Sequence, residues 1–250
     1  MARESFSRYQ SYTAQIENRR KMAKFFKTLL ILLVIYGIFQ TILLRGLRIQ
    51  NESMAPQITS GDLVLSSPLL TGPRVPVFGW SLPAVRGLQR GDLVEIKPGY
   101  HKPLPFWISG PDEVLRFLSF NFFSLEDVVS QDWDHSTSVK RLIGLPGDRV
   151  KMKDYTAYIQ PPTESSFLSE YELSPVRYDL TKDPLPEGWI ETFPLSSGAQ
   201  EILLGKDEYF VLGDNRSGSS DSRLWGVIKG YDILALVFLQ YWPLGEFGQP

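Results

Sequence analysis

The stretch V-K-R-L-I-G-L-P-G-D-R-V, Val139 to Val150, combines a β-strand pattern with a tight turn. Successive side chains of an extended strand point to opposite faces, so Lys140 and Leu142 share one face while Val139 and Arg141 share the other. The G-L-P-G-D that follows is a turn sequence. The stretch therefore predicts a strand that carries a lysine on an apolar face and ends in a turn.

Similar short apolar runs recur through residues 46–250: D-L-V-L, D-L-V-E-I, Y-F-V-L and D-I-L-A-L-V-F-L, bounded by Gly, Pro, Asp or Asn. Runs of this kind are typical of β-strands. Residues 233–242 are too few to cross a membrane and are expected to form a buried strand. The segment from Ser165 to Ala199 has weak periodicity and four prolines, which favours a long insertion or cap. We therefore predict a mostly β fold with a long insertion.

The composition excludes several classes of function. A chain of 250 residues has enough length for one ordinary domain behind a short N-terminal extension. Its formal net charge of −2 provides no basic field, so no nucleic-acid partner is expected. The chain has no cysteine, which excludes disulfides and thiolate metal sites, and its two histidines leave little for a zinc site. Neither a metal nor a cofactor is expected.

The N-terminal region has the pattern of a membrane anchor. Residues 28–44 read T-L-L-I-L-L-V-I-Y-G-I-F-Q-T-I-L-L, without a charge, and a cluster of five basic residues lies directly before them: Arg19, Arg20, Lys21, Lys24 and Lys27. A run of this length just spans a bilayer, and the positive charges keep its N-terminal side in the cytoplasm. We predict a cytoplasmic tail (1–27), a single transmembrane anchor (28–44) in the cytoplasmic (inner) membrane, and an extracytoplasmic catalytic domain (45–250).

A cleaved signal peptide is the alternative for this region, because it also begins with positive charges and an apolar core. Three features oppose it: the long polar tail before the apolar run, the length of that run, and the lack of a small-x-small site after it. A retained anchor is the preferred interpretation.

Ser53, in N-E-S-M-A-P, and Lys140 are the candidate catalytic pair. A serine hydroxyl needs a neighbouring base before it attacks a carbonyl, and neither histidine has a setting that suggests a triad. Burial disfavours the charged form of a lysine and lowers its pKa by up to several units, so Lys140 can be that base. Taken singly, a serine near a proline is usually a turn residue and a K-R pair is usually solvated.

Four sequence boxes carry a resemblance. They are S-M-A-P (53–56), G-D-L-V (91–94), K-R-L-I-G-L-P-G-D (140–148) and G-D-N-R-S-G-S-S-D-S-R-L-W-G (213–226). Any one of these boxes is a weak sign of relationship to a family, but all four in this order behind an anchor are a specific sign. Over about residues 45–245 the chain resembles bacterial type I signal peptidases (leader peptidases), membrane-anchored serine proteases that use a Ser/Lys dyad.

The resemblance implies a fold and a set of roles. The fold would be the β-fold of these proteases. Ser53 would attack the scissile carbonyl and form an acyl-enzyme, with Lys140 as general base. The supporting residues that it implies are Ser219, as a hydrogen-bond partner of Lys140, Asp221 and Arg223, which hold the frame of the site, and Arg141, as a further partner of Asp221. In isolation, G-S-S-D-S-R reads as a polar β-turn.

Asn51 departs from the family pattern, in which many members have a serine two residues before the nucleophile. That serine helps to stabilise the oxyanion, and an asparagine amide can also donate to one. Our hypothesis is that Asn51 and the backbone N–H of Ser53 form the oxyanion hole.

The substrates implied by the resemblance are the signal peptides of exported preproteins, cut after small-x-small (A-x-A-like) sites. An extended substrate would add to a strand edge, with alternate side chains entering two shallow pockets. The candidate substrate-binding residues are Ile49, Met54, Ile58, Thr137, Ser138 and Val139; plain core packing is an equal alternative for the apolar ones. The implied partners include the lipid bilayer, with the secretion translocon as a further candidate.

Two further alternatives stay open. The aromatic stretch from Val114 to Leu125 fits either an interfacial element or a core extension. For the whole chain, the alternatives to an active signal peptidase are a self-cleaving protease of the repressor type, which is cytosolic and has no anchor, and a catalytically inactive, membrane-tethered binding or scaffold protein of the same fold.

Overall fold

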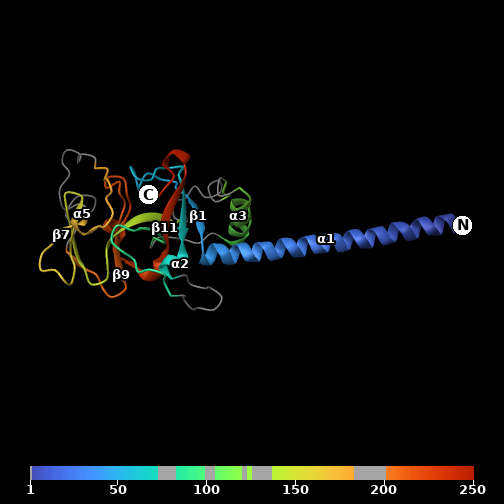
Figure 1. Cartoon of the computed structure of the whole chain (residues 1–250), viewed down its shortest axis with the longest axis horizontal. Coiled ribbons are helices and arrows are strands. Elements are labelled where there is room, and N and C mark those ends of the chain that lie inside the picture. Colours follow the sequence, from blue (N-terminus) through green and yellow to red (C-terminus); the bar gives the residue numbers. More distant parts are fainter. Residues whose placement is uncertain (1, 73–82, 99–104, 120–122, 126–136, 183–200) are drawn as a thin grey trace. The chain divides into compact units, whose positions relative to one another are not determined.

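The computed structural model describes residues 2–72, 83–98, 105–119, 123–125, 137–182 and 201–250 (Figure 1). The chain divides into two compact units, residues 1–40 and 41–250. The helical elements of the described ranges are α1 (Ala2–Ile42), α2 (Pro68–Thr71), α3 (Phe106–Leu118), α5 (Glu170–Leu173) and α6 (Ser222–Trp225), with 3-10 turns η1 (Gly230–Asp232) and η2 (Leu244–Glu246).

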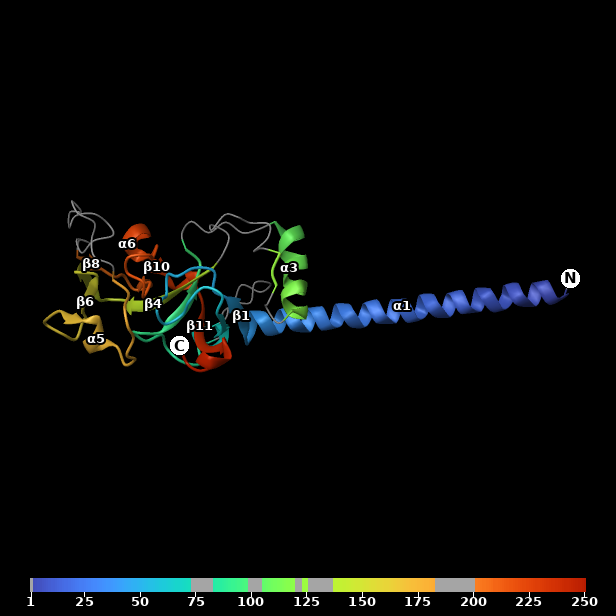
Figure 2. The ribbon, with the colours of Figure 1, turned by 90° about the horizontal axis from the view of Figure 1, so that it is seen from above.

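The larger sheet has the strand order β1-β2-β11-β3-β4-β9-β10, and every pair in it is antiparallel. Its strands are β1 (Arg45–Arg48), β2 (Leu63–Ser67), β3 (Leu93–Ile96), β4 (Ser138–Gly144), β9 (Glu208–Leu212), β10 (Ile228–Lys229) and β11 (Ile233–Trp242). The predicted strands at 139–143 and 233–242 are thus confirmed. β11 crosses the middle of this sheet (Figures 1 and 2).

The sheet curls. In a flat sheet β1 and β4 would lie about 19 Å apart, four strand spacings of about 4.8 Å. Yet Ile49, just after β1, belongs to one buried cluster with Val139 of β4. Irregular register between β11 and β2, at Val237/Leu239 and Gln240/Trp242, increases the local twist that such curling needs. The curl brings the segment after β1 against β4.

The smaller sheet has the order β7-β6-β5-β8 and lies at the end of this unit opposite to α3 (Figures 1 and 2). Its strands are β5 (Arg149–Lys153), β6 (Thr156–Gln160), β7 (Leu168–Ser169) and β8 (Ile202–Leu203). Asp154 and Tyr155 join β5 to β6, and both have positive φ angles, as a two-residue hairpin turn requires.

The predicted insertion at 165–199 is packed in its described part. It provides β7 and α5, and the side chains of Glu170 and Tyr178 are buried in the interior behind the smaller sheet. Residues 183–199 lie outside the described residues. The first half of this segment therefore contributes to a core.

The aromatic stretch at 114–125, for which the sequence favours either an interfacial element or a core extension, begins inside α3. This helix spans residues 106–118 and includes Pro111. Trp107 and Phe123 are exposed, while residues 120–122 lie outside the described set. Whether this stretch meets a membrane stays a prediction.

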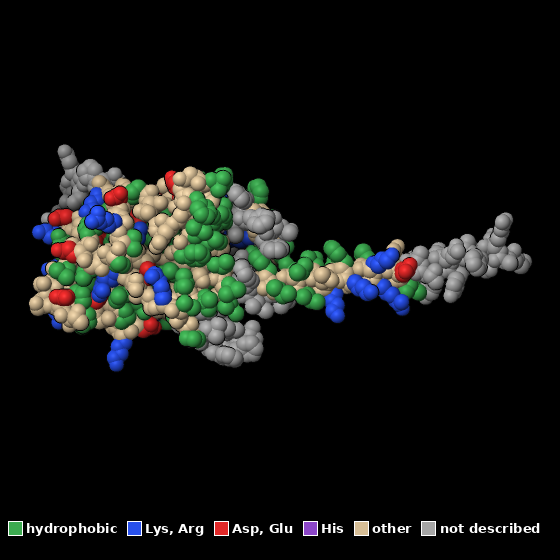
Figure 3. Space-filling view, in the orientation of Figure 1, with side chains coloured by type: hydrophobic (Ala, Val, Ile, Leu, Met, Phe, Trp, Pro, Cys, Tyr) green, Lys and Arg blue, Asp and Glu red, His purple; other side chains and the backbone are tan. Residues whose placement is uncertain are grey.

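In the described part of α1, basic side chains lie together on one segment, with apolar side chains toward the C-terminal part of the helix (Figure 3). Large apolar side chains such as Leu30, Leu32 and Ile35 are exposed along it. Among residues whose side chains the structure describes, none of the helices has the length and apolarity that a membrane crossing requires. Positions 34 and 37–41, inside the predicted anchor, lie outside that set.

Candidate active site

The side chains of Ser53 and Lys140 contact each other next to β4 of the larger sheet. Ser53 lies in the turn-rich segment after β1, and Lys140 belongs to β4. The Lys140 Nζ donates to the Ser53 Oγ over 2.7 Å, and both residues are buried, with 2% and 6% of their surface exposed. A strand and a loop 87 positions apart in sequence thus bring a hydroxyl and an amine into one hydrogen-bonded pair.

The environment of Lys140 favours its neutral form. The pKa of Lys140 is lowered from 10.5 to about 8; burial is the largest cause and the Arg223 charge adds to it, while the charges of Asp221 and Asp214 oppose the shift. A neutral amine has a lone pair that accepts a proton, whereas an ammonium group does not. Lys140 is therefore suited to act as a base in mildly alkaline solution.

The backbone of the 213–221 loop contacts the backbone of Ser53. The Asn215 N–H donates to the Ser53 carbonyl oxygen over 3.1 Å. At Gly213 a Cβ atom would overlap both that carbonyl oxygen and the Ser219 side chain, so only glycine fits. This close approach fixes the main chain at Ser53 against the loop.

Asp221 and Arg223 form a buried ion pair. The Arg223 Nε and Nη2 donate to the two carboxylate oxygens over 2.8 and 2.9 Å, and the Gly213 N–H donates to Asp221 over 3.0 Å. Burial alone would raise the pKa of Asp221, but these donors and the Arg223 charge outweigh it and hold the pKa below its usual range. Asp221 directly precedes α6, and the hydrogen bond that it accepts from Gly213 joins this helix to the loop that contacts Ser53.

Arg141 pairs with Asp214, and the prediction that it pairs with Asp221 is wrong. Its Nε and Nη2 donate to Asp214 over 2.8 and 2.6 Å, its Nη1 donates to the Gly91 carbonyl oxygen, and its guanidinium lies 4.0 Å from the centre of the Tyr178 ring. Asp221 is already engaged by Arg223, which follows it by two residues. Arg141–Asp214 and Arg223–Asp221 are therefore separate bidentate pairs.

Ser219 is buried beside Gly213. Its hydroxyl has no hydrogen bond of acceptable geometry in the described structure, although it lies close enough to Asp221 to favour that carboxylate's charged form. The expected hydrogen bond to Lys140 is not formed in this conformation. Ser219 thus lies in the predicted place without the predicted contact.

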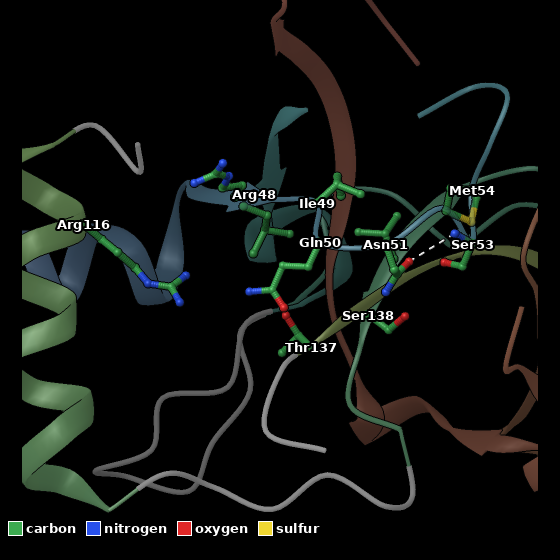
Figure 4. A pocket seen from close by; sticks show the side chains of 11 residues that line it. Arg48, Ile49, Gln50, Asn51, Ser53, Met54, Arg116, Thr137 and Ser138 are labelled. Atoms are coloured by element: carbon green, nitrogen blue, oxygen red, sulfur yellow. Dashed lines mark hydrogen bonds between the residues drawn. The ribbon is translucent and has the colours of Figure 1, made fainter. Parts of the chain in front are cut away.

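Asn51 contacts the Ser53 backbone directly. The Asn51 Oδ1 accepts a hydrogen bond from the Ser53 N–H over 3.1 Å (Figure 4). In this conformation the N–H is engaged, so an incoming oxyanion would have to displace the Asn51 oxygen. The oxyanion hole stays a prediction.

A groove leads away from the Ser53 side chain (Figure 4). It includes five of the predicted substrate-binding residues and both predicted oxyanion donors; its full lining is Leu47, Arg48, Ile49, Gln50, Asn51, Ser53, Met54, Arg116, Thr137, Ser138 and Val139. Ile58 does not line it, because this side chain is wholly buried in the cluster with Ile49 and Met54. Core packing is therefore the role that Ile58 has here.

The wall formed by β4 has an open edge. Ser138 to Arg141 pair with β3, but the pairing of β4 with β9 begins only at Arg141. Within the described residues, the stretch from Ser138 to Lys140 is thus paired on one side only. An extended peptide has room to pair on the other side.

Sequence reasoning missed several residues of this region. Arg48, Gln50 and Arg116 line the groove, and Arg216 and Glu170 form a buried bidentate ion pair that joins the 213–221 loop to α5. The arginine of G-D-N-R, the first of the two in the 213–226 box, was the available signal for Arg216. No sequence signal singled out Arg116, which comes from α3.

No group of three or more His, Asp or Glu side chains in the described ranges is arranged to hold a metal ion.

Comparison with known proteins identifies the family to which this chain is related. The model of the signal peptidase family, peptidase S26, matches residues 22–242. Signal peptidase IB of Staphylococcus aureus is 33% identical over 109 residues, which are 44% of this chain and 55% of the relative. A probable signal peptidase I-2 of Synechocystis sp. is 29% identical over 127 residues, 50% of this chain and 48% of the relative. The chain spans about half the length of these curated relatives.

A crystal structure of a signal peptidase I from Enterococcus faecalis V583 is 23% identical, with a TM-score of 0.32, and the match covers 61% of this chain and 98% of that one. The family match covers most of the chain, including both Ser53 and Lys140. The chain therefore belongs to the signal peptidase family, peptidase S26.

Proposed function

We propose that this chain is a serine endopeptidase that removes signal peptides from exported preproteins after small-x-small sites. The observation that carries the proposal is the 2.7 Å hydrogen bond between the Ser53 Oγ and the Lys140 Nζ, in a buried site at the end of a groove. Membership of the family supports the same conclusion.

The dyad would act in two stages. Neutral Lys140 takes the proton of the Ser53 hydroxyl while the oxygen attacks the scissile carbonyl, and the resulting ammonium gives that proton to the leaving amine. A water then enters, Lys140 takes its proton, and the hydroxide released attacks the ester. The ester bond to Ser53 breaks, and the serine recovers its proton from Lys140.

The oxyanion hole would be built from Asn51 and the Ser53 N–H. For this the Asn51 side chain must turn so that its Nδ2, rather than its Oδ1, faces the substrate carbonyl. The exposure of Asn51 supports such a rotation.

The groove would give the enzyme its selectivity for small substrate residues. A substrate strand paired with the open edge from Ser138 to Lys140 would place alternate side chains against Ile49, Met54 and Val139, each of which is buried. Such walls reject bulky side chains by steric overlap, so small residues at the first and third positions before the cut are favoured.

The membrane anchor at 28–44 belongs to the same proposal, with the catalytic unit on the extracytoplasmic side. Exposed apolar side chains along α1 and the preceding basic cluster support it. An anchored enzyme meets its substrates where a signal peptide's cleavage site leaves the bilayer.

The test is cleavage of a preprotein with an A-x-A site by the full chain. We expect Ser53→Ala and Lys140→Ala to abolish cleavage, while Lys153→Ala, which removes an exposed lysine of β5, retains it. Full activity of the Lys140→Ala protein would exclude the dyad. Substrate binding without cleavage by the unaltered chain would favour the inactive scaffold.

A further inference from the structure

The described part of the predicted insertion, residues 165–182, contacts the 213–221 loop at two places. The first contact is the ion pair between Glu170, at the start of α5, and Arg216 of the loop. Both side chains have 1% or less of their surface exposed. A segment that sequence reasoning left without a role is therefore bound, in the interior, to the loop that contacts Ser53.

The Arg216 side chain connects α5 with the backbone at Gly213. Its Nη1 and Nη2 donate to the two carboxylate oxygens of Glu170, and its Nε donates to the Gly213 carbonyl oxygen over 2.9 Å. Gly213 is the residue at which a Cβ would overlap the Ser53 carbonyl oxygen. The place of this guanidinium therefore affects the backbone packed against Ser53.

Glu170 is itself fixed by two further donors. The Ala157 N–H of β6 donates to its Oε1 over 2.8 Å, and the Tyr178 hydroxyl donates to its Oε2 over 2.8 Å. The Tyr178 ring also lies against the Arg141 guanidinium of β4. A carboxylate that binds several donors at once is held in one orientation, so the smaller sheet sets the orientation of Arg216.

The second contact is a parallel backbone bridge between Thr181 and Asn215. The Thr181 N–H donates to the Asp214 carbonyl oxygen over 3.1 Å, and the Thr181 carbonyl oxygen accepts from the Arg216 N–H over 2.9 Å. The Asn215 N–H donates instead to the Ser53 carbonyl oxygen over 3.1 Å. The backbone at Asn215 is therefore hydrogen-bonded between Thr181 and Ser53.

We propose that Glu170 and Thr181 are positioning residues, through which the 165–182 segment sets the place of Ser53 relative to Lys140. The inference rests on the proposed function for the reaction that this pair performs. Glu170 acts through Arg216, and Thr181 acts through the backbone at 214–216. A displacement of about 1 Å can lower the rate of a reaction about a hundredfold, so contacts of this kind affect kcat.

The test compares Glu170→Gln with the matched control Asp148→Asn in the full chain in detergent. Each of these carboxylates has 1% of its side-chain surface exposed, and each binds an arginine and a backbone N–H. The partners of Asp148, which are Arg90 and Leu145, lie outside the 213–221 loop. Both substitutions should lower the free energy of unfolding, because each weakens a buried ion pair.

The two variants should differ in activity. We expect Glu170→Gln to lower kcat for an A-x-A peptide by about 10- to 100-fold with little change in KM, because the groove is left intact. Asp148→Asn should keep the kcat of the unaltered chain. Tyr178→Phe guards against misfolding: it removes one donor to Glu170, keeps the ring, and should lower kcat by less.

Unchanged kcat in both Glu170→Gln and Tyr178→Phe would overturn the proposal. An equal loss of kcat in Glu170→Gln and Asp148→Asn would overturn it too, because the effect would then follow from stability alone.

Hydrogen exchange separates this inference from the proposed function, because it requires no turnover. Relative to the amides of β11, the Gly213 and Asn215 amides should exchange faster in Glu170→Gln than in Asp148→Asn. If this difference is found but the unaltered chain cleaves no preprotein, the positioning of the loop stands and the peptidase proposal fails. If the unaltered chain cleaves and the two variants exchange alike, the positioning role is wrong and the peptidase stands.

Discussion

At the scale of single residues, the site depends on short-range contacts around the nucleophile. Ser53 is held from three sides: Lys140 bonds its hydroxyl, Asn215 bonds its carbonyl oxygen, and Asn51 bonds its N–H. Each contact fixes a different atom of one residue. The backbone of Ser53 is therefore fixed on both sides, and its hydroxyl faces Lys140.

Asn51 is the residue on which the oxyanion prediction depends. We expect Asn51→Ala to lower kcat by about two to three orders of magnitude with little change in KM, because a lost oxyanion donor affects mainly the transition state. Asn51→Ser, which keeps a donor, should recover part of that loss. Steady-state kinetics on an A-x-A peptide measure both. An unchanged kcat in Asn51→Ala would exclude the side chain.

At the scale of elements, two buried ion pairs hold the 213–226 segment: one joins it to β4, and the other lies within it. Arg141 of β4 binds Asp214, and Arg223 of α6 binds Asp221. All four side chains have 1% or less of their surface exposed. Removing one member of such a pair leaves an uncompensated charge in the interior.

Asp214→Ala should therefore destabilise the fold by about 3–5 kcal/mol, the usual cost of breaking a buried pair. Chemical denaturation gives the free energy of unfolding. The control is Glu201→Ala, which breaks the half-exposed pair with Arg149 and should cost about 0–1 kcal/mol. Equal losses in the two variants would mean that burial does not set the strength of these pairs.

The sequence predicted the elements that carry local patterns and missed contacts set by tertiary packing. The strand at Lys140 follows from alternation, and the strand at 233–242 follows from its length. The sequence does not show whether Asp214 or Asp221 is the partner of Arg141. Both aspartates lie in the same box, and that box forms a loop, whose conformation cannot be predicted from periodicity. Arg116 reaches the groove only because α3 packs beside it.

At the scale of the whole molecule, the proposed anchor is tested by placing charge in α1. Leu30 and Leu32 are exposed apolar residues of the predicted span. Each arginine near the centre of a span costs about 2.5–3.5 kcal/mol, so Leu30→Arg with Leu32→Arg should lower the carbonate-resistant membrane fraction.

Leu203→Arg, at an exposed position of the smaller sheet, is the control and should not change that fraction. A chain that carbonate extracts even without substitution would contradict the anchor.

The whole fold also creates the environment of Lys140. Its strand lies inside a curled sheet of elements drawn from both ends of the unit, and this burial lowers the pKa of Lys140 to about 8. Below that pH the ammonium form dominates and cannot accept the Ser53 proton. The neutral fraction rises with pH and levels off above the pKa, and under the proposed mechanism we expect the rate to follow it.

The most direct test of this account is the pH dependence of kcat/KM for an A-x-A peptide, which reports the ionisation of the free enzyme. We predict a rise of about tenfold per pH unit at low pH, a midpoint near 8 and a plateau above it. A profile that is flat from about pH 6 to about pH 10, or one whose midpoint lies near the ordinary lysine value of 10.5, would contradict a buried neutral Lys140 as the base.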